Sequence, residues 1–172
     1  MDIQIKNLSV SFPSPKGDAR VLRNADIILK SGKITAIVGE SGSGKSILGA
    51  AVMGLLESSV RVSGEILFGN TDLLSLSEKE LNSIRGAQIG WIAQDPVTAM
   101  DPMMKVGKQM MEGVHFYRNG KETKADGIRQ LEEFGLSDAQ RVWDAYPFGL
   151  SGGMAQRVLT AMMTLPGPEW LF

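Results

Sequence analysis

The stretch Gly39-Glu40-Ser41-Gly42-Ser43-Gly44-Lys45-Ser46 decides the fold, because it fits the pattern G-x-x-x-x-G-K-[ST]. The apolar run at residues 34–38 before it predicts a buried strand of a parallel sheet, and residues 47–56 after it predict a mostly apolar helix. Glycines let the backbone bend tightly, so that consecutive N–H groups and the positive end of the helix face an anion. The pattern therefore predicts a phosphate-binding loop, the P-loop.

Each part of the loop has an expected role toward a nucleotide. Lys45 supplies a point charge at the β- and γ-phosphates, and the Ser46 hydroxyl is placed to coordinate a Mg²⁺ ion that bridges them. We expect ATP to contact Gly39, Ser41, Gly42, Ser43, Gly44, Lys45 and Ser46. The alternative is a glycine-rich turn before an ordinary helix, and the strand and helix on either side argue against it. The reaction stays open, because many enzyme classes share this loop.

Composition narrows the classes of partner. The chain has 172 residues, of which 43% are hydrophobic, enough for a real core in one domain or a domain with a small insertion. Eighteen basic and nineteen acidic residues give a net charge of −1, which disfavours a nucleic-acid partner. The absence of cysteine excludes disulfides and thiolate chemistry. Neither a signal peptide nor an apolar run of about 18 residues is present, so we expect a cytosolic chain whose membrane link runs through a partner.

The remaining N-terminal half predicts further short elements. Alternating apolar positions at residues 3–12 indicate a strand of an antiparallel layer, followed by a loop at 13–18. Further strands are expected at residues 25–29, 64–68 and 89–93, the last ending at Gln94. The capping-box spacing from Ser77 to Glu80 predicts a helix that ends near Gly86. The expected fold class is α/β: a P-loop NTPase core, mostly parallel with an N-terminal antiparallel layer.

The middle of the chain is helical in pattern. Apolar residues recur at steps of three and four from Met103 to Tyr117, and again from Ile128 to Phe134. This predicts a helical subdomain at residues 95–149, between a core at 1–94 and a final segment at 150–172. The methionines between Met103 and Tyr117, called here the methionine stripe, are interpreted as a packing surface rather than as a metal site. His115 has no second candidate ligand beside it and is interpreted as structural or exposed.

A second motif occupies residues 150–157, Leu-Ser-Gly-Gly-Met-Ala-Gln-Arg, ahead of an expected helix. A hydroxyl and two glycines at a helix N-terminus offer N–H donors to an anion, although a Ser-Gly-Gly turn by itself is usually a loop and cap. Following a P-loop by about a hundred residues, the octapeptide resembles the signature of the ATP-binding-cassette (ABC) ATPases. The resemblance covers the whole chain.

The resemblance implies roles for further residues. Phe12 matches the aromatic residue that stacks on adenine, although the strand pattern alone makes it a core or edge aromatic. Gln94 matches the glutamine that contacts magnesium, joins the core to the helical subdomain and senses a transmembrane partner; by itself it would be a solvated polar residue. Ser151, Gly152 and Gly153 match residues that bind the γ-phosphate held by a second ABC subunit. The implied catalytic residues are thus Lys45 and Gln94, and the implied metal ligands Ser46 and Gln94.

Two longer segments resemble one subfamily of ABC importers. Residues 94–102 and 146–154 look like the ATP-binding subunits that energise uptake of dipeptides, oligopeptides and nickel. Phe148 and Gly149 stand where many members have a polar or acidic pair. The resemblance implies a peripheral protein on the cytoplasmic face of the membrane, with permease subunits and a second ATPase subunit as partners and no nucleic acid.

The family's catalytic carboxylates are expected to lie outside these residues. In the family, the strand after the signature helix ends in Asp-Glu, and the chain ends at Phe172, inside the expected strand. Glu169 opens that strand rather than closing it, and His115 precedes the signature, so neither matches a catalytic residue. We expect an importer subunit that is truncated and inactive alone. The alternatives are a non-hydrolytic nucleotide-binding module and a chromosome or repair ATPase, whose long coiled-coil insertions are missing.

Overall fold

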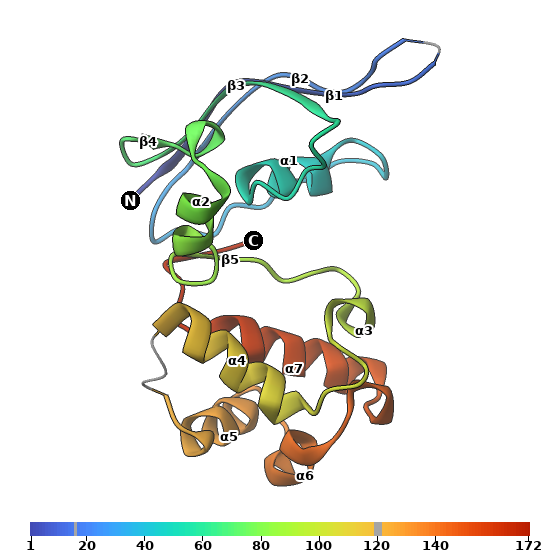
Figure 1. The fold of residues 1–172 in the computed structure, drawn as a ribbon, viewed down its shortest axis with the longest axis vertical. Helices are drawn as coiled ribbons and strands as arrows, with labels where there is room; N and C mark the ends of the chain where they lie inside the picture. The colour runs from blue at the N-terminus through green and yellow to red at the C-terminus, as the bar shows by residue number, and fades with distance from the viewer. Residues whose placement is uncertain (16, 119–121) are drawn as a thin grey trace. The chain divides into compact units, whose positions relative to one another are not determined.

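The structure is a computed structural model that describes residues 1–15, 17–118 and 122–172, so that Lys16 of the expected loop lies outside it. The chain forms two compact units, Met1–Leu81 and Asn82–Phe172, and each is described by itself. Figure 1 labels helices α1–α7 and strands β1–β5.

An antiparallel sheet dominates the first unit (Figure 1). Its strand order is β2-β1-β3-β4, formed by β1 (Ile3–Phe12), β2 (Ala19–Leu29), β3 (Arg61–Phe68) and β4 (Thr71–Asp72). The expected antiparallel layer is confirmed, and β2 begins six residues earlier than predicted.

The buried side of β1 changes phase at a bulge. Ile3 and Ile5 are buried at odd positions, whereas Leu8 and Val10 are buried at even ones. Between them Asn7 has a φ of 50°, and Gly64 of β3 has a φ of 107°. A Cβ on Gly64 would lie 2.6 Å from the carbonyl oxygen of Asn7, so only glycine fits opposite this bulge. The bulge keeps four apolar side chains of β1 on the core side.

The helices of the first unit are short. They are α1 (Lys45–Val52), the 3₁₀ turn η1 (Leu73–Ser75) and the first residues of α2 (Glu78–Ile84), which runs on past Leu81. The predicted capping box is present, since Glu80 Oε2 accepts hydrogen bonds from Ser77 N at 2.8 Å and Ser77 Oγ at 2.6 Å. The helix predicted from Ser77 is confirmed.

The buried strand predicted at residues 34–38 is wrong in this structure. The segment forms no strand, and Ile34 and Val38 are 102% and 91% exposed. A strand of a parallel sheet needs hydrogen-bonded neighbours and layers on both faces. No described strand pairs with this segment, so its apolar side chains stay in solvent.

The second unit combines a small parallel sheet with a helical layer. Strands β5 (Ile89–Gly90) and β6 (Trp170–Leu171) pair in parallel, so the strand expected at 89–93 is shorter than predicted. The helices are α3 (Pro96–Ala99), α4 (Val106–Arg118), α5 (Lys124–Glu133), α6 (Ala139–Asp144), the 3₁₀ turn η2 (Pro147–Gly149) and α7 (Gly152–Thr164).

The helical core is organised around Trp143 of α6, which is 7% exposed. Its indole ring lies against Gly107 of α4 and Gly127 of α5, and a Cβ on either glycine would overlap the ring. The methionine stripe divides between two environments: Met110 is 1% exposed in this core, whereas Met103 is 83% exposed before α4. Other buried members of the core are Met100, Val106, Leu131, Leu136, Ala139, Val142, Ala155, Val158, Leu159, Ala161 and Met162.

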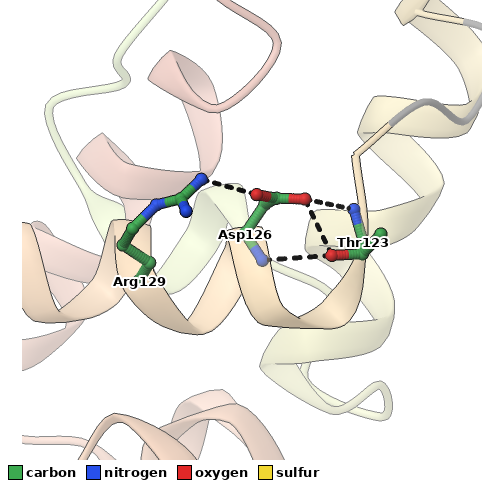
Figure 2. Close-up of polar contacts among 3 residues, drawn as sticks. All are labelled: Thr123, Asp126 and Arg129. Carbon is green, nitrogen blue, oxygen red and sulfur yellow. Dashed lines mark hydrogen bonds and ion pairs between the residues drawn. The ribbon is translucent and has the colours of Figure 1, made fainter.

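A capping box begins α5 (Figure 2). Asp126 Oδ2 accepts from Thr123 N at 2.8 Å and from Thr123 Oγ1 at 2.7 Å, and Arg129 pairs with Oδ1 at 2.5 Å. The Thr123 backbone and hydroxyl bonds hold the pKa of the Asp126 carboxyl below its usual value, because they favour the ionised form.

Candidate functional site

The P-loop curls around the ammonium group of Lys45, the first residue of α1. Lys45 Nζ donates to the carbonyl oxygens of Gly39 at 2.7 Å and Glu40 at 2.6 Å, and to Ser43 Oγ at 3.3 Å. The loop closes on itself through Ser43 N, which donates to Glu40 O at 3.2 Å. The lysine charge is thereby fixed inside the loop by neutral oxygens and carries no carboxylate partner among these contacts.

The glycines of the loop are required by its conformation. Gly42 and Gly44 have φ values of 81° and 92°, in the left-handed region that favours glycine. A Cβ on Gly39 would lie 2.6 Å from Ser43 Oγ, and one on Gly44 would lie 2.7 Å from Leu22 Cδ2 of β2. A larger residue would be strained by the backbone conformation at Gly42 and Gly44, and at Gly39 it would force the Ser43 side chain to move.

The start of α1 is suited to an anion and a cation together. Gly44 caps the helix without a side-chain hydrogen bond, and no acidic residue occupies the first turn. The free N–H groups and the positive helix end therefore favour a negative ligand. Ser46 is exposed one residue into the helix, while Ser41 is exposed in the loop. A single hydroxyl suits Mg²⁺, which keeps most of its ligands as water and phosphate oxygens.

Phe12 ends β1, where it pairs with Ala19 of β2 and is half-buried. Aromatic rings that are partly exposed can stack on a planar ligand. The P-loop contacts the same β2 strand through Leu22, so Phe12 and the loop belong to one unit.

The signature residues form the N-terminus of α7 in the second unit. Ser151 caps this helix, with its Oγ accepting from Met154 N at 3.4 Å. Gly152 and Gly153 are exposed, have no positive φ, and would meet no heavy atom within 4 Å if a Cβ were added. Neither conformation nor packing within the chain requires glycine at these two positions.

Gln94 lies exposed in the segment between β5 and α3. The next residue, Asp95, caps α3, with Oδ1 accepting from Val97 N at 3.0 Å and from Thr98 N at 3.4 Å. Helix α3 packs against α7, as Figure 1 shows, so the segment after Gln94 is attached to the signature helix.

Comparison with known proteins identifies the family. Residues 22–172 match the sequence profile of the family described as "ABC transporter". The chain belongs to the ABC transporter family. It is 39% identical over 171 residues to the oligopeptide transport ATP-binding protein OppD of Escherichia coli strain K12, covering 98% of this chain and 51% of OppD. It is 40% identical over 174 residues to the dipeptide transport ATP-binding protein DppD of Lactococcus lactis subsp. cremoris, covering 98% of this chain and 50% of DppD. The chain thus spans about half the length of these relatives.

Solved structures of ABC proteins share the fold. The ATP-binding cassette MJ0796, a dimer in a post-hydrolysis state with ADP and phosphate, has a TM-score of 0.85 and 25% identity, covering 96% of this chain and 70% of that chain. A bacterial Atm1-family ABC exporter with ATP bound has a TM-score of 0.74 and 21% identity, covering 99% and 28% of the two chains, and supports the fold alone. The expected α/β fold of a P-loop NTPase is confirmed.

One further residue of the ABC signature has a structural role that sequence analysis did not assign. Arg157 Nε donates to Gly153 O at 3.2 Å, and its Nη1 donates to Gly135 O at 3.0 Å, just after the end of α5. Arg157 thereby ties the first turn of the signature helix to α5. The partner lies 22 residues away, so local sequence patterns give no signal for this contact.

Metal sites and membrane-spanning helices were sought in residues 1–15, 17–118 and 122–172 of this ABC protein. Within them, no group of three or more His, Cys, Asp or Glu side chains is placed to hold a metal ion. His115 is exposed on α4. Among the helices that can be described, none is long and apolar enough to cross a membrane.

Proposed function

We propose that the chain is the ATP-binding part of an ABC importer for oligopeptides or dipeptides, with MgATP bound at residues 39–46. One observation carries this proposal: Lys45 Nζ is fixed inside a glycine loop at the start of α1, with only neutral oxygens as partners. A triphosphate would supply the anion that this ammonium lacks. Ser46 would contribute the protein ligand to Mg²⁺, and Phe12 would stack on the adenine.

Binding of labelled ATP at equilibrium tests this assignment. Removing the Lys45 charge costs on the order of 1.5–3 kcal/mol, which predicts that Lys45→Ala weakens ATP binding roughly 10- to 150-fold. Lys79→Ala removes an exposed lysine of α2 and serves as the matched control, with no expected change. Equal affinities of Lys45→Ala and the control would refute the assignment.

The signature residues are proposed to complete the nucleotide site of a second ABC subunit. Gly152 and Gly153 are glycines that neither backbone conformation nor internal packing explains, and the space beside them is open to something that approaches from outside. An anion drawn to the helix N-terminus is the ligand that fits. The relative MJ0796 is a dimer in its post-hydrolysis structure, which supports association of two cassettes here.

Substitution of these glycines separates association from stability. Gly152→Ala and Gly153→Ala should leave the melting temperature unchanged or slightly raised, because alanine favours the helix and meets no neighbour. Each should abolish ATP-dependent association, measured by sedimentation or light scattering. ATP-driven dimers of unchanged affinity in both variants would exclude this role.

The names of the two relatives lead to proposals about the transported molecule, the partner subunits and the location in the cell. We propose a peptide as cargo because both relatives are named for peptide transport, with nickel as the alternative that the motifs leave. Permease subunits would dock near Gln94 and the segment before α4, where Val97 and Met103 are exposed and a flexible methionine suits an adaptable contact. That docking would place the protein at the cytoplasmic face of the membrane. We also propose that the ATP-binding core ends at residue 94 and that the helical subdomain ends at residue 149.

Catalysis by these 172 residues alone is a separate question. Lys45 and Gln94 are the catalytic residues that the motifs assign, and both act by binding and orienting rather than by accepting a proton. The Asp-Glu pair that provides the family's general base is not among the residues described here. We therefore propose that residues 1–172 by themselves bind ATP without useful turnover, as in the alternative of a non-hydrolytic nucleotide-binding module.

A further inference from the structure

A cavity of about 510 Å³ lies against the antiparallel sheet of the first unit, lined by parts of β1, β2 and β3. Its polar lining includes Ser9, Ser11, Arg20, Arg23, Arg61 and Ser63. The volume is within the range of small-molecule sites. No motif of the sequence analysis falls in this cavity.

The positive charge around the cavity is concentrated beyond what composition predicts. Residues 1–81 hold as many acidic as basic residues, yet all three of their arginines, Arg20, Arg23 and Arg61, line this one cavity. No acidic residue is among the lining residues. Among the described residues, neither Arg20 nor Arg23 has an ion-pair partner. Arg61 pairs with Asp18 at 2.5 Å.

The sheet register places these side chains on one face. Ser11 of β1 is the cross-strand neighbour of both Arg20 on β2 and Arg61 on β3, and cross-strand neighbours share a face. The next residue back along β1, Val10, is 1% exposed and belongs to the opposite, core-facing side. The backbones of β2 and β3 are about 10 Å apart, two strand spacings, so long arginine side chains from both strands can reach one ligand, and the charge of three lining arginines favours a ligand with more than one anionic group.

We infer that this cavity is a second anion site, separate from the P-loop, which takes a small molecule carrying two or more phosphate groups. Guanidinium groups bind phosphate oxygens in pairs of hydrogen bonds, and serine hydroxyls add donors between them. The ligand would bridge β2 and β3 across β1. Because the P-loop is also expected to bind phosphate, the binding assay has to distinguish the two sites.

The test is titration calorimetry of the protein with inorganic tripolyphosphate. The measurement is made in the Lys45→Ala background, so that binding at the P-loop is weakened. We expect one saturable site with a dissociation constant below about 1 mM. Arg20→Gln should weaken the binding of tripolyphosphate about tenfold or more. Arg23→Gln, which also changes an exposed side chain, is the second variant. Asp18→Asn should strengthen it about two- to fivefold, because it releases Arg61 from a surface ion pair.

Arg141→Gln is the matched control, since Arg141 is an exposed arginine of the second unit that pairs with Asp138 at 2.9 Å. The Arg141→Gln variant should bind tripolyphosphate with the same affinity as the Lys45→Ala background. Competition by ADP would extend the same site to nucleoside phosphates, and its absence would restrict the site to inorganic polyphosphate. Equal weakening by Arg20→Gln and Arg141→Gln, or loss of all binding with Lys45→Ala, would overturn the proposal. So would arginine-dependent binding of a polyglutamate peptide without binding of tripolyphosphate.

Discussion

Alanine substitution at two glycines of α4 should change stability in opposite directions. Gly113 has open space around it, and a Cβ there meets no heavy atom within 4 Å. Gly107 lies against the ring of Trp143, and a Cβ there would overlap ring atoms. Both substitutions exchange the same residues in the same helix, so the difference between them isolates the contact with Trp143.

The magnitudes follow from helix propensity and overpacking. Gly113→Ala should stabilise by up to about 1 kcal/mol, because alanine is the better helix former. Gly107→Ala gains no more than this from propensity, whereas displacing a tightly packed ring costs about 1–3 kcal/mol. Trp143 is 7% exposed and also touches Gly127 of α5, so its ring has little room to move. We expect the two variants to differ by about 1–3 kcal/mol, or roughly 2–10 °C in melting temperature.

Thermal unfolding followed by far-ultraviolet circular dichroism measures both variants. Trp143→Phe provides the internal control, because a smaller ring should relieve the overlap. In that background Gly107→Ala should cost less than it does beside Trp143, which a double-mutant cycle reports as a coupling energy. Equal melting temperatures for Gly107→Ala and Gly113→Ala, or no coupling to Trp143, would refute the packing argument.

Two further predictions concern the capping boxes and the chemistry. The pKa of Glu80 is lowered first by the hydroxyl of Ser77, whereas that of Asp126 is lowered first by the backbone N–H of Thr123. Ser77→Ala should therefore release more of the Glu80 shift than Thr123→Val releases for Asp126, each without affecting the other carboxyl in an NMR titration. Because both folded pKa values lie below the unfolded ones, this stabilisation is present above the unfolded pKa and is lost as pH falls through the folded one. A polypeptide of residues 1–172 should release phosphate from ATP at far below about 1 s⁻¹, since loss of a general base costs about 10²–10⁴-fold. Turnover near that rate that disappears with Lys45→Ala would show that a base lies within these residues.

Local signals in the sequence predicted the parts of the fold that depend on local physics. The helix after Ser77 follows from a hydroxyl and a carboxylate three residues apart, and the structure contains both hydrogen bonds. The same spacing occurs between Thr123 and Asp126, where it begins α5. The P-loop and the signature were found because their glycine, lysine and serine residues are adjacent in the chain.

Features that depend on distant partners could not be predicted in the same way. The apolar pattern of residues 34–38 indicates a preference for a buried strand, but a strand forms only where other strands supply hydrogen bonds. Arg61 and Arg20 come to lie on one face of the sheet only through the register of three strands, and Arg157 reaches Gly135 only through the packing of α7 near α5. Each of these contacts depends on tertiary structure that no short window of sequence contains.

Glycine shows why a residue type by itself does not reveal its function. At Gly44 the backbone has a positive φ that side chains disfavour, and at Gly107 and Gly127 a tryptophan ring occupies the place of a Cβ. The sequence gives the same letter at Gly152 and Gly153, where the structure contains neither constraint. Gly113 lacks both constraints as well, so what distinguishes Gly152 and Gly153 is their place at an exposed helix N-terminus. This position is the basis of the proposal that an anion carried by another subunit binds at the N-terminus that Ser151 caps.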